Sequence, residues 1–100
     1  MLHDIEKSTR EVLDEYPIRK AAFFGSVLEE RFDEKSDVDI IIEFLPGTRG
    51  IEFFGLKLDL EERLKRPIDL MTFNALTKAN SKFKNVVERE AYVFYERTDK

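Results

Sequence analysis

The 100-residue sequence contains no cysteine and no tryptophan, and it has a single histidine. Without cysteine, the chain can form no disulfide, no thiolate metal site and no cysteine nucleophile. The longest apolar run falls far short of the roughly 18 residues that a membrane span requires, and the first ten residues lack the apolar core of a signal peptide. We therefore expect a protein of the cytoplasm that has no membrane partner.

Basic residues are also too few for a broad grip on nucleic acid. The chain has 17 Lys and Arg against 21 Asp and Glu, and its net charge is −4. Because phosphate contacts supply most non-specific affinity, we do not expect direct binding to nucleic acid. The acidity is concentrated in residues 29–43, which hold seven acidic and two basic residues. This run is either a solvated acidic loop or a set of carboxylates gathered for divalent cations.

The spacing of apolar residues predicts helices and strands that alternate along the whole chain, with no linker, repeat or low-complexity segment. We expect helices over residues 2–15, 27–31 and 50–65, one or two helical segments over 74–89, and strands over 18–24, 37–44, 68–72 and 91–96. This order in 100 residues predicts one domain over residues 1–100 with an α/β (α+β) fold, in which helices pack on a single sheet.

Two aspartates at the start of the strand 37–44 are candidates for chemistry. Side chains two residues apart in a strand point to the same face, so Asp37 and Asp39 should project together. Asp69, in the strand 68–72, would join them if the two strands are neighbours. Carboxylates this close raise each other's pKa, and a bound Mg²⁺ relieves that repulsion. The alternative is an exposed acidic pair at the entry to a strand.

Gly25 and Ser26 follow the first predicted strand, where the chain turns into a short helix. A glycine lets the backbone approach a phosphate closely, a serine adds a hydroxyl, and amides at a helix start point towards an anion. Ser26 could instead be only a helix cap. A glycine-serine turn together with acidic residues for metal ions is what nucleotidyl transfer requires, because the reaction is an in-line displacement at phosphorus.

These residues carry a resemblance to a known family. Gly25-Ser26, ten further residues and then Asp37-Val38-Asp39 are similar to the GSx10DxD signature of the polymerase-β-like nucleotidyltransferase superfamily. The segment Arg66–Thr72 and the final AYVFYE resemble its minimal nucleotidyltransferase (MNT) branch. The resemblance covers nearly the whole chain. It implies a small mixed β-sheet with helices packed on one face and the site on the open face.

The resemblance also implies roles for these residues and a partner. Asp37, Asp39 and Asp69 would be catalytic and would ligate two Mg²⁺ ions, with Asp69 helping to activate the acceptor hydroxyl. Gly25 and Ser26 would hold the phosphates of ATP. Members of this branch pair with a helical HEPN-type RNase as a toxin–antitoxin system. We therefore expect transfer of AMP from ATP to a hydroxyl, that of a tyrosine, on a HEPN-type toxin within a hetero-oligomer.

One segment departs from the family pattern. After Gly-Ser the family often carries a small residue, an arginine and a glycine, whereas this chain has Val27-Leu28-Glu29-Glu30. Glu29 should repel a triphosphate. This departure keeps open an alternative function, a catalytically degenerate binding module that neutralises its partner by steric masking.

Two apolar residues, Ile41 and Met71, should share the face of the aspartates. If that face lacks helices they need another cover, and we hypothesise that a partner protein docks there.

Four of the phenylalanines are expected in the core rather than on a base-stacking surface: Phe53, Phe54, Phe73 and Phe83.

Overall fold

The computed structural model describes residues 2–29, 32–33, 35–79 and 81–97, without the side chains of residues 26, 77, 79 and 81–84. Most elements end within two residues of their predicted bounds. The exception is the short helix after the first strand, which is a 3₁₀ turn that already begins at Gly25. The elements in chain order are α1 (Leu2–Leu13), β1 (Ile18–Phe24), η1 (Gly25–Leu28), β2 (Val38–Phe44), α2 (Ile51–Leu64), β3 (Ile68–Thr72), α3 (Phe73–Ala79), α4 (Ser81–Glu90) and β4 (Tyr92–Glu96).

The four strands form one mixed sheet in the order β3-β2-β1-β4. β1 lies antiparallel to both β2 and β4, whereas β2 and β3 are parallel. A parallel pair needs a crossover connection, and α2 provides it between β2 and β3. The registers place Phe24 opposite Asp39 and Asp39 opposite Asp69, so residues from three strands share one row across the sheet.

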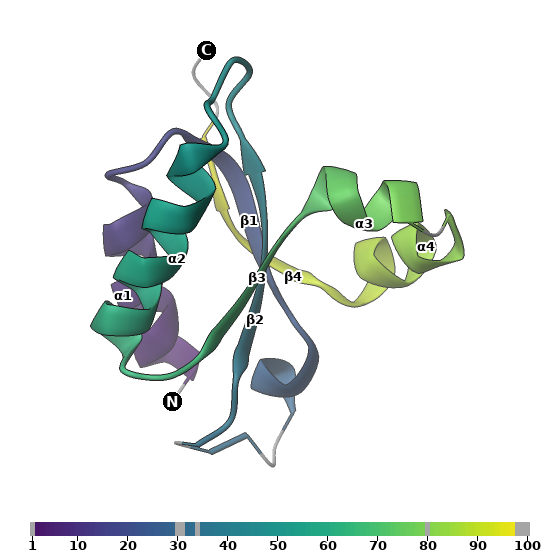
Figure 1. The fold of residues 1–100 in the computed structure, drawn as a ribbon. Coiled ribbons are helices and arrows are strands. Elements are labelled where there is room, and N and C mark those ends of the chain that lie inside the picture. Colours follow the sequence, from purple (N-terminus) through teal and green to yellow (C-terminus); the bar gives the residue numbers. More distant parts are fainter. Residues whose placement is uncertain (1, 30–31, 34, 80, 98–100) are drawn as a thin grey trace.

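The helices α1 and α2 cover one face of the sheet (Figure 1). Both are amphipathic: α1 buries Ile5, Val12 and Leu13, and α2 buries Leu56 and Leu60. These side chains form the main hydrophobic core with the strand residues that point to the same face: Ile18, Ala21, Phe23, Val38, Ile40, Ile42, Ile68, Leu70 and Phe94. A mixed four-stranded sheet with packed helices confirms the predicted fold class.

The prediction that the helices occupy one face is incomplete, because α3 and α4 lie on the opposite side of the sheet (Figure 1). The physical reason is local: α3 begins at Phe73, directly after β3, so the chain turns off the sheet without a loop. α3 then contacts both β2 and β3. The second face is therefore covered in part, and the carboxylates lie beside this cover rather than on a bare sheet.

This cover removes the reason for a partner docking on Ile41. Ile41 is completely buried and Met71 is half-buried. The hypothesis of a docking surface formed by these two residues is therefore wrong for Ile41. Large apolar side chains are exposed instead on the outward side of α2, where Ile51, Phe54 and Leu58 are 66–67% exposed. Phe54 is consequently not the core residue that the sequence predicted.

No helix among the described residues has both the length and the apolar character needed to cross a bilayer.

Candidate functional site

The centre of the candidate site is a pair of carboxyl groups on the two parallel strands. Asp39 on β2 and Asp69 on β3 are register partners, and their side chains are hydrogen-bonded to each other. Burial, the negative charge of Asp69 and this hydrogen bond, with a smaller effect from Asp37, together raise the pKa of Asp39 to about 6. A nearby cation would therefore stabilise the ionised form of Asp39.

The third predicted carboxylate, Asp37, stands one residue before β2 and is exposed. It lies close enough to Asp39 for its charge to contribute to the raised pKa. Nevertheless, the described residues contain no group of three or more His, Cys, Asp or Glu side chains gathered tightly enough to enclose an ion. The structure thus brings Asp39 and Asp69 together and leaves Asp37 alongside them.

Gly25 closes the other side of the carboxylate pair. Its φ of +78° lies in the left-handed region, and a Cβ at this position would stand 2.5 Å from Oδ2 of Asp39. Only glycine lets the turn after β1 approach the carboxylate this closely. Ser26 follows in η1, but its side chain lies outside the described residues, so both of its interpretations remain predictions.

The segment that leads to Asp37 is held by Arg66, a residue that the sequence reasoning missed. Arg66 Nη1 donates hydrogen bonds of 3.0 Å to the carbonyl oxygens of Asp33 and Ser36, and the guanidinium stacks over Phe32 at 4.9 Å. Ser36 accepts a hydrogen bond from the Asp33 backbone N–H and donates one to the Asp33 carboxylate, so it closes a turn before β2. A lone arginine before the β3 strand was the only signal in the sequence, and spacing alone does not show which backbone it reaches.

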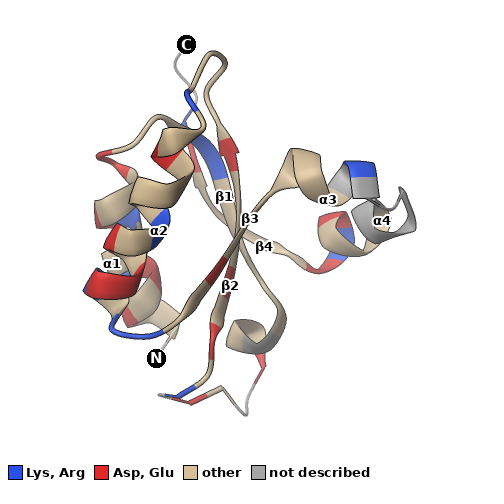
Figure 2. Ribbon diagram, viewed as in Figure 1, with Lys and Arg blue, Asp and Glu red and all other residues tan. Residues whose placement is uncertain are grey.

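Acidic residues dominate this end of the sheet. Figure 2 shows red positions on β2 and β3 and on the segment between η1 and β2. Carboxylate oxygens are the donors that Mg²⁺ prefers in proteins, and the partly desolvated carboxylate of Asp39, whose pKa is raised, is stabilised when a cation binds. The donor chemistry of Asp39 and Asp69 therefore fits a divalent cation, and Asp37 adds a further negative charge nearby.

Comparisons with known proteins agree with this geometry. The family model described as polymerase beta, nucleotidyltransferase, matches residues 7–100. Two relatives come from Methanocaldococcus jannaschii. The one named "Putative protein adenylyltransferase MJ0435" is 31% identical over 75 residues, which cover 75% of this chain and 81% of the relative. The similarly named MJ0128 is 32% identical over 93 residues, which cover 92% and 94% of the two chains.

Solved structures show the same fold. A structure described as a minimal nucleotidyltransferase superimposes with a TM-score of 0.74 at 26% identity, covering 90% of this chain and 89% of the other. A toxin–antitoxin structure with AMP-PNP gives a TM-score of 0.73 at 18% identity, covering 93% and 74%. A tri-AMPylated HEPN toxin from Shewanella oneidensis in complex with its MNT antitoxin gives 0.69 at 19% identity, covering 97% and 74%.

The match over residues 7–100 includes Gly25, Ser26 and all three aspartates, on a sheet that aligns Asp39 with Asp69. This chain belongs to the polymerase beta nucleotidyltransferase family.

Proposed function

We propose that this nucleotidyltransferase is an Mg²⁺-dependent protein adenylyltransferase, which moves AMP from ATP to a tyrosine hydroxyl of a HEPN-type helical toxin and thereby acts as its antitoxin. The observation that carries the proposal is the hydrogen-bonded Asp39–Asp69 pair with Gly25 against it. The names of the Methanocaldococcus jannaschii relatives support the reaction. The Shewanella oneidensis complex supports the kind of partner.

Each residue has a definite part in this proposal. Asp39 and Asp69, with Asp37 beside them, would hold Mg²⁺, which neutralises charge on the phosphates when it is bound. Gly25 allows the backbone to approach the triphosphate, and Ser26 would add its hydroxyl. Asp69 is exposed, so an acceptor hydroxyl can reach it. A pKa of about 6 for Asp39 leaves that carboxyl mainly ionised at pH 7 and above, as a cation ligand must be.

The bond changes follow from an in-line displacement. The acceptor oxygen bonds to the α-phosphorus of ATP. The bond between that phosphorus and the oxygen that bridges it to the β-phosphorus breaks. Pyrophosphate leaves with the bonding electron pair. The proton of the acceptor hydroxyl passes to the carboxylate of Asp69, which is the role that an exposed acid at the edge of the pair can fill.

The proposal is tested by incubating the protein with labelled ATP, Mg²⁺ and a HEPN-type RNase encoded beside it. We expect the wild type to label a tyrosine of the RNase and Asp39→Asn to lose this transfer by at least about a hundredfold. Asp4 is an exposed acid on α1, distant in the sequence from the three aspartates of the site. Asp4→Asn is therefore the matched control and should transfer AMP normally. Equal labelling by all three proteins would remove the carboxylate pair from the mechanism.

Steric masking without catalysis is the second candidate function, and Glu29 is the residue that favours it. This acid is exposed and follows η1 directly, four residues after Gly25. Toxin neutralisation that survives in the double variant Asp37→Ala/Asp39→Ala, without label on the toxin, would establish masking. Under the enzymatic proposal, Glu29→Gln should tighten ATP binding a few-fold because it removes one repulsive charge from a solvated surface. Isothermal titration calorimetry measures this change.

A further inference from the structure

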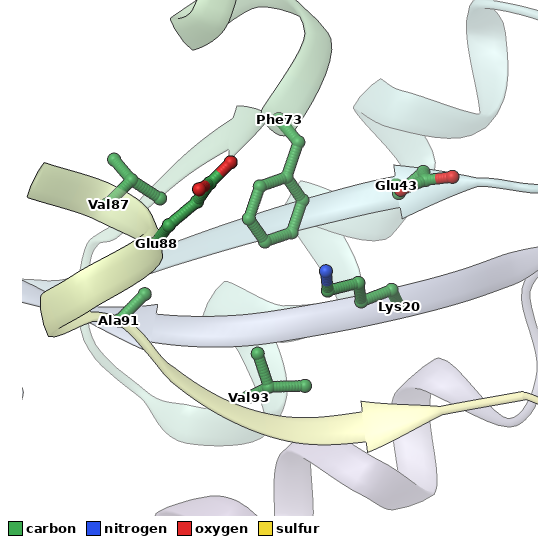
Figure 3. A pocket seen from close by; sticks show the side chains of 7 residues that line it. All are labelled: Lys20, Glu43, Phe73, Val87, Glu88, Ala91 and Val93. Atoms are coloured by element: carbon green, nitrogen blue, oxygen red, sulfur yellow. The ribbon is translucent and has the colours of Figure 1, made fainter. Parts of the chain in front are cut away.

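A cavity of about 260 Å³ lies on the same face of the sheet as the carboxylate pair, beneath α3 and α4 (Figure 3). The ring of Phe73 forms one wall, and the ammonium of Lys20 lies 4.9 Å from its centroid. Glu43 and Glu88 add carboxylates at its edge, while the rest of the lining is apolar: Val87, Ala91 and Val93. Figure 3 shows the Phe73 ring and the Lys20 side chain turned towards each other across this space.

The registers fix where this cavity lies relative to the site. Lys20 pairs with Glu43 just as Phe24 pairs with Asp39, and no register shift interrupts β1 and β2 between these two pairs. Glu43 is therefore on the same face as Asp39 and about 13 Å from it along β2, at 3.3 Å per residue. The buried side chain of Ile41 lies between them on that face. The cavity is thus a second site, separate from the carboxylates but in line with them.

The proposed reaction brings together two ring systems that could occupy the cavity, the acceptor tyrosine and the base of the nucleotide. The distance between the cavity and the carboxylates decides between them. An acceptor hydroxyl must come within hydrogen-bonding reach of its base, so a tyrosine ring seated in the cavity would hold its hydroxyl too far from Asp69. The base of the nucleotide has the opposite requirement, because the ribose separates it from the α-phosphate that reacts. The distance therefore matches the donor nucleotide and excludes the acceptor side chain.

The lining also matches a purine. A cavity of 260 Å³ is slightly smaller than the roughly 300–1,000 Å³ of pockets that take whole ligands, so it suits one ring system. Phe73 offers a face for stacking, the Lys20 ammonium can donate to a ring nitrogen, and a carboxylate can accept from an exocyclic amine. The apolar residues Val87, Ala91 and Val93 exclude water from the remaining surface of the base.

Resting on the proposed function, we infer that this cavity seats the purine base of the nucleoside triphosphate donor. The carboxylates and the Gly25 turn then hold the phosphate end of the same molecule. Affinity for ATP consequently has two separable parts, one at each end of the sheet face. Only the part that comes from the purine base depends on the cavity.

The test compares ATP with inorganic tripolyphosphate, which has the phosphates but no base, in calorimetric titrations of the full chain with Mg²⁺. Ala91→Phe fills the cavity, and Ala75→Phe makes the same change at an exposed position of α3 outside it. We expect Ala91→Phe to weaken ATP binding at least tenfold and to leave tripolyphosphate binding unchanged, while Ala75→Phe binds both as the wild type does. Phe73→Leu keeps an apolar wall without a ring and should weaken ATP at least about fivefold.

The outcomes separate this inference from the proposed function. If the wild type labels the toxin but Ala91→Phe and Phe73→Leu bind ATP as tightly as the wild type, the cavity assignment is overturned and the function stands. If the wild type binds ATP in a cavity-dependent way but transfers nothing to the toxin, the assignment stands and the function fails. Loss of toxin binding alone in Ala91→Phe would also overturn the assignment. Thermal unfolding shows whether each variant is folded, and Phe73→Leu decides the matter should Ala91→Phe fail to fold.

Discussion

Replacing Gly25 by alanine tests the contact on which the candidate site depends. The residue has a φ of +78°, and a left-handed backbone costs about 1–2 kcal/mol for a residue with a side chain. The new Cβ would stand 2.5 Å from Oδ2 of Asp39, so the carboxyl must rotate away from Asp69 and give up their hydrogen bond. Below about pH 6, where Asp39 holds the proton of that bond, its loss adds about 0.5–1.5 kcal/mol. At that pH we expect the unfolding free energy to fall by roughly 1.5–3.5 kcal/mol in total.

Gly47 provides a matched control. Its φ is +83°, but a Cβ there would meet nothing within 4 Å. Gly47→Ala therefore carries the same backbone strain without the contact, and it should lose only about 1–2 kcal/mol. In a domain of this size, each kcal/mol corresponds to about 4–8 °C in the unfolding midpoint. Scanning calorimetry on both variants separates the two contributions.

Activity provides the sharper comparison between the two glycines. A displacement of about 1 Å in a reacting group can reduce the rate about a hundredfold, so Gly25→Ala should lose AMP transfer by about that factor. Gly47→Ala should keep the wild-type rate below its unfolding temperature. The reasoning is refuted if both variants transfer AMP equally well, or if Gly25→Ala is no less stable than Gly47→Ala.

Three further predictions concern charge, loop position and packing. Because the pKa of Asp39 is about 6 in the folded chain and 3.8 as its ordinary value, the folded state holds a proton that the unfolded state releases between these pH values, and wild-type stability falls as pH rises through this window. Asp39→Asn lacks this proton, so urea unfolding should show it to be more stable than the wild type at pH 8 and equal at pH 3.5; parallel pH curves would contradict this. Arg66→Lys cannot donate to two carbonyls from one planar group, so hydrogen exchange in residues 35–37 should quicken and transfer should slow, whereas unchanged exchange would rule out the anchoring role. On α2, Leu56→Ala should cost about 2–5 kcal/mol in urea unfolding and Leu58→Ala no more than about 0.5, because the first side chain is fully buried and the second is 66% exposed.

The fold could be predicted because its signals are local. Leu56 and Leu60 repeat at helical spacing, Val38 to Phe44 is dense in β-branched residues, and Pro17 and Pro67 mark where elements cannot continue. The placement of α3 and α4 could not be predicted in this way. It depends on the direction in which the chain leaves β3 at Phe73, and no residue pattern records that direction.

The residues of the candidate site likewise fall into those that the sequence indicated and those that it did not. The spaced Gly-Ser and Asp-x-Asp pattern identified Gly25, Asp37 and Asp39, and the position of Asp69 in the strand 68–72 made it a third candidate on the condition that the two strands are neighbours. Arg66 and Lys20 were missed, and Phe73 was expected in the core although it is half-buried, because the contacts of all three join residues distant in the sequence. Arg66 reaches back 30 residues to the carbonyl of Ser36, and such a contact exists only once the strands are paired.

By itself, the sequence determined the helices, the strands and the family, since periodicity, β-branching and a spaced motif are properties of neighbouring residues. Only the tertiary structure decided that Asp69 lies beside Asp39 and raises the pKa of Asp39, because that depends on the parallel register of β2 with β3. It also decided that Ile41 is buried by the chain itself and that a cavity opens beside Phe73. Both follow from packing between segments distant in the sequence, because the favourable free energy comes from burying apolar surfaces that come into contact only in the folded chain.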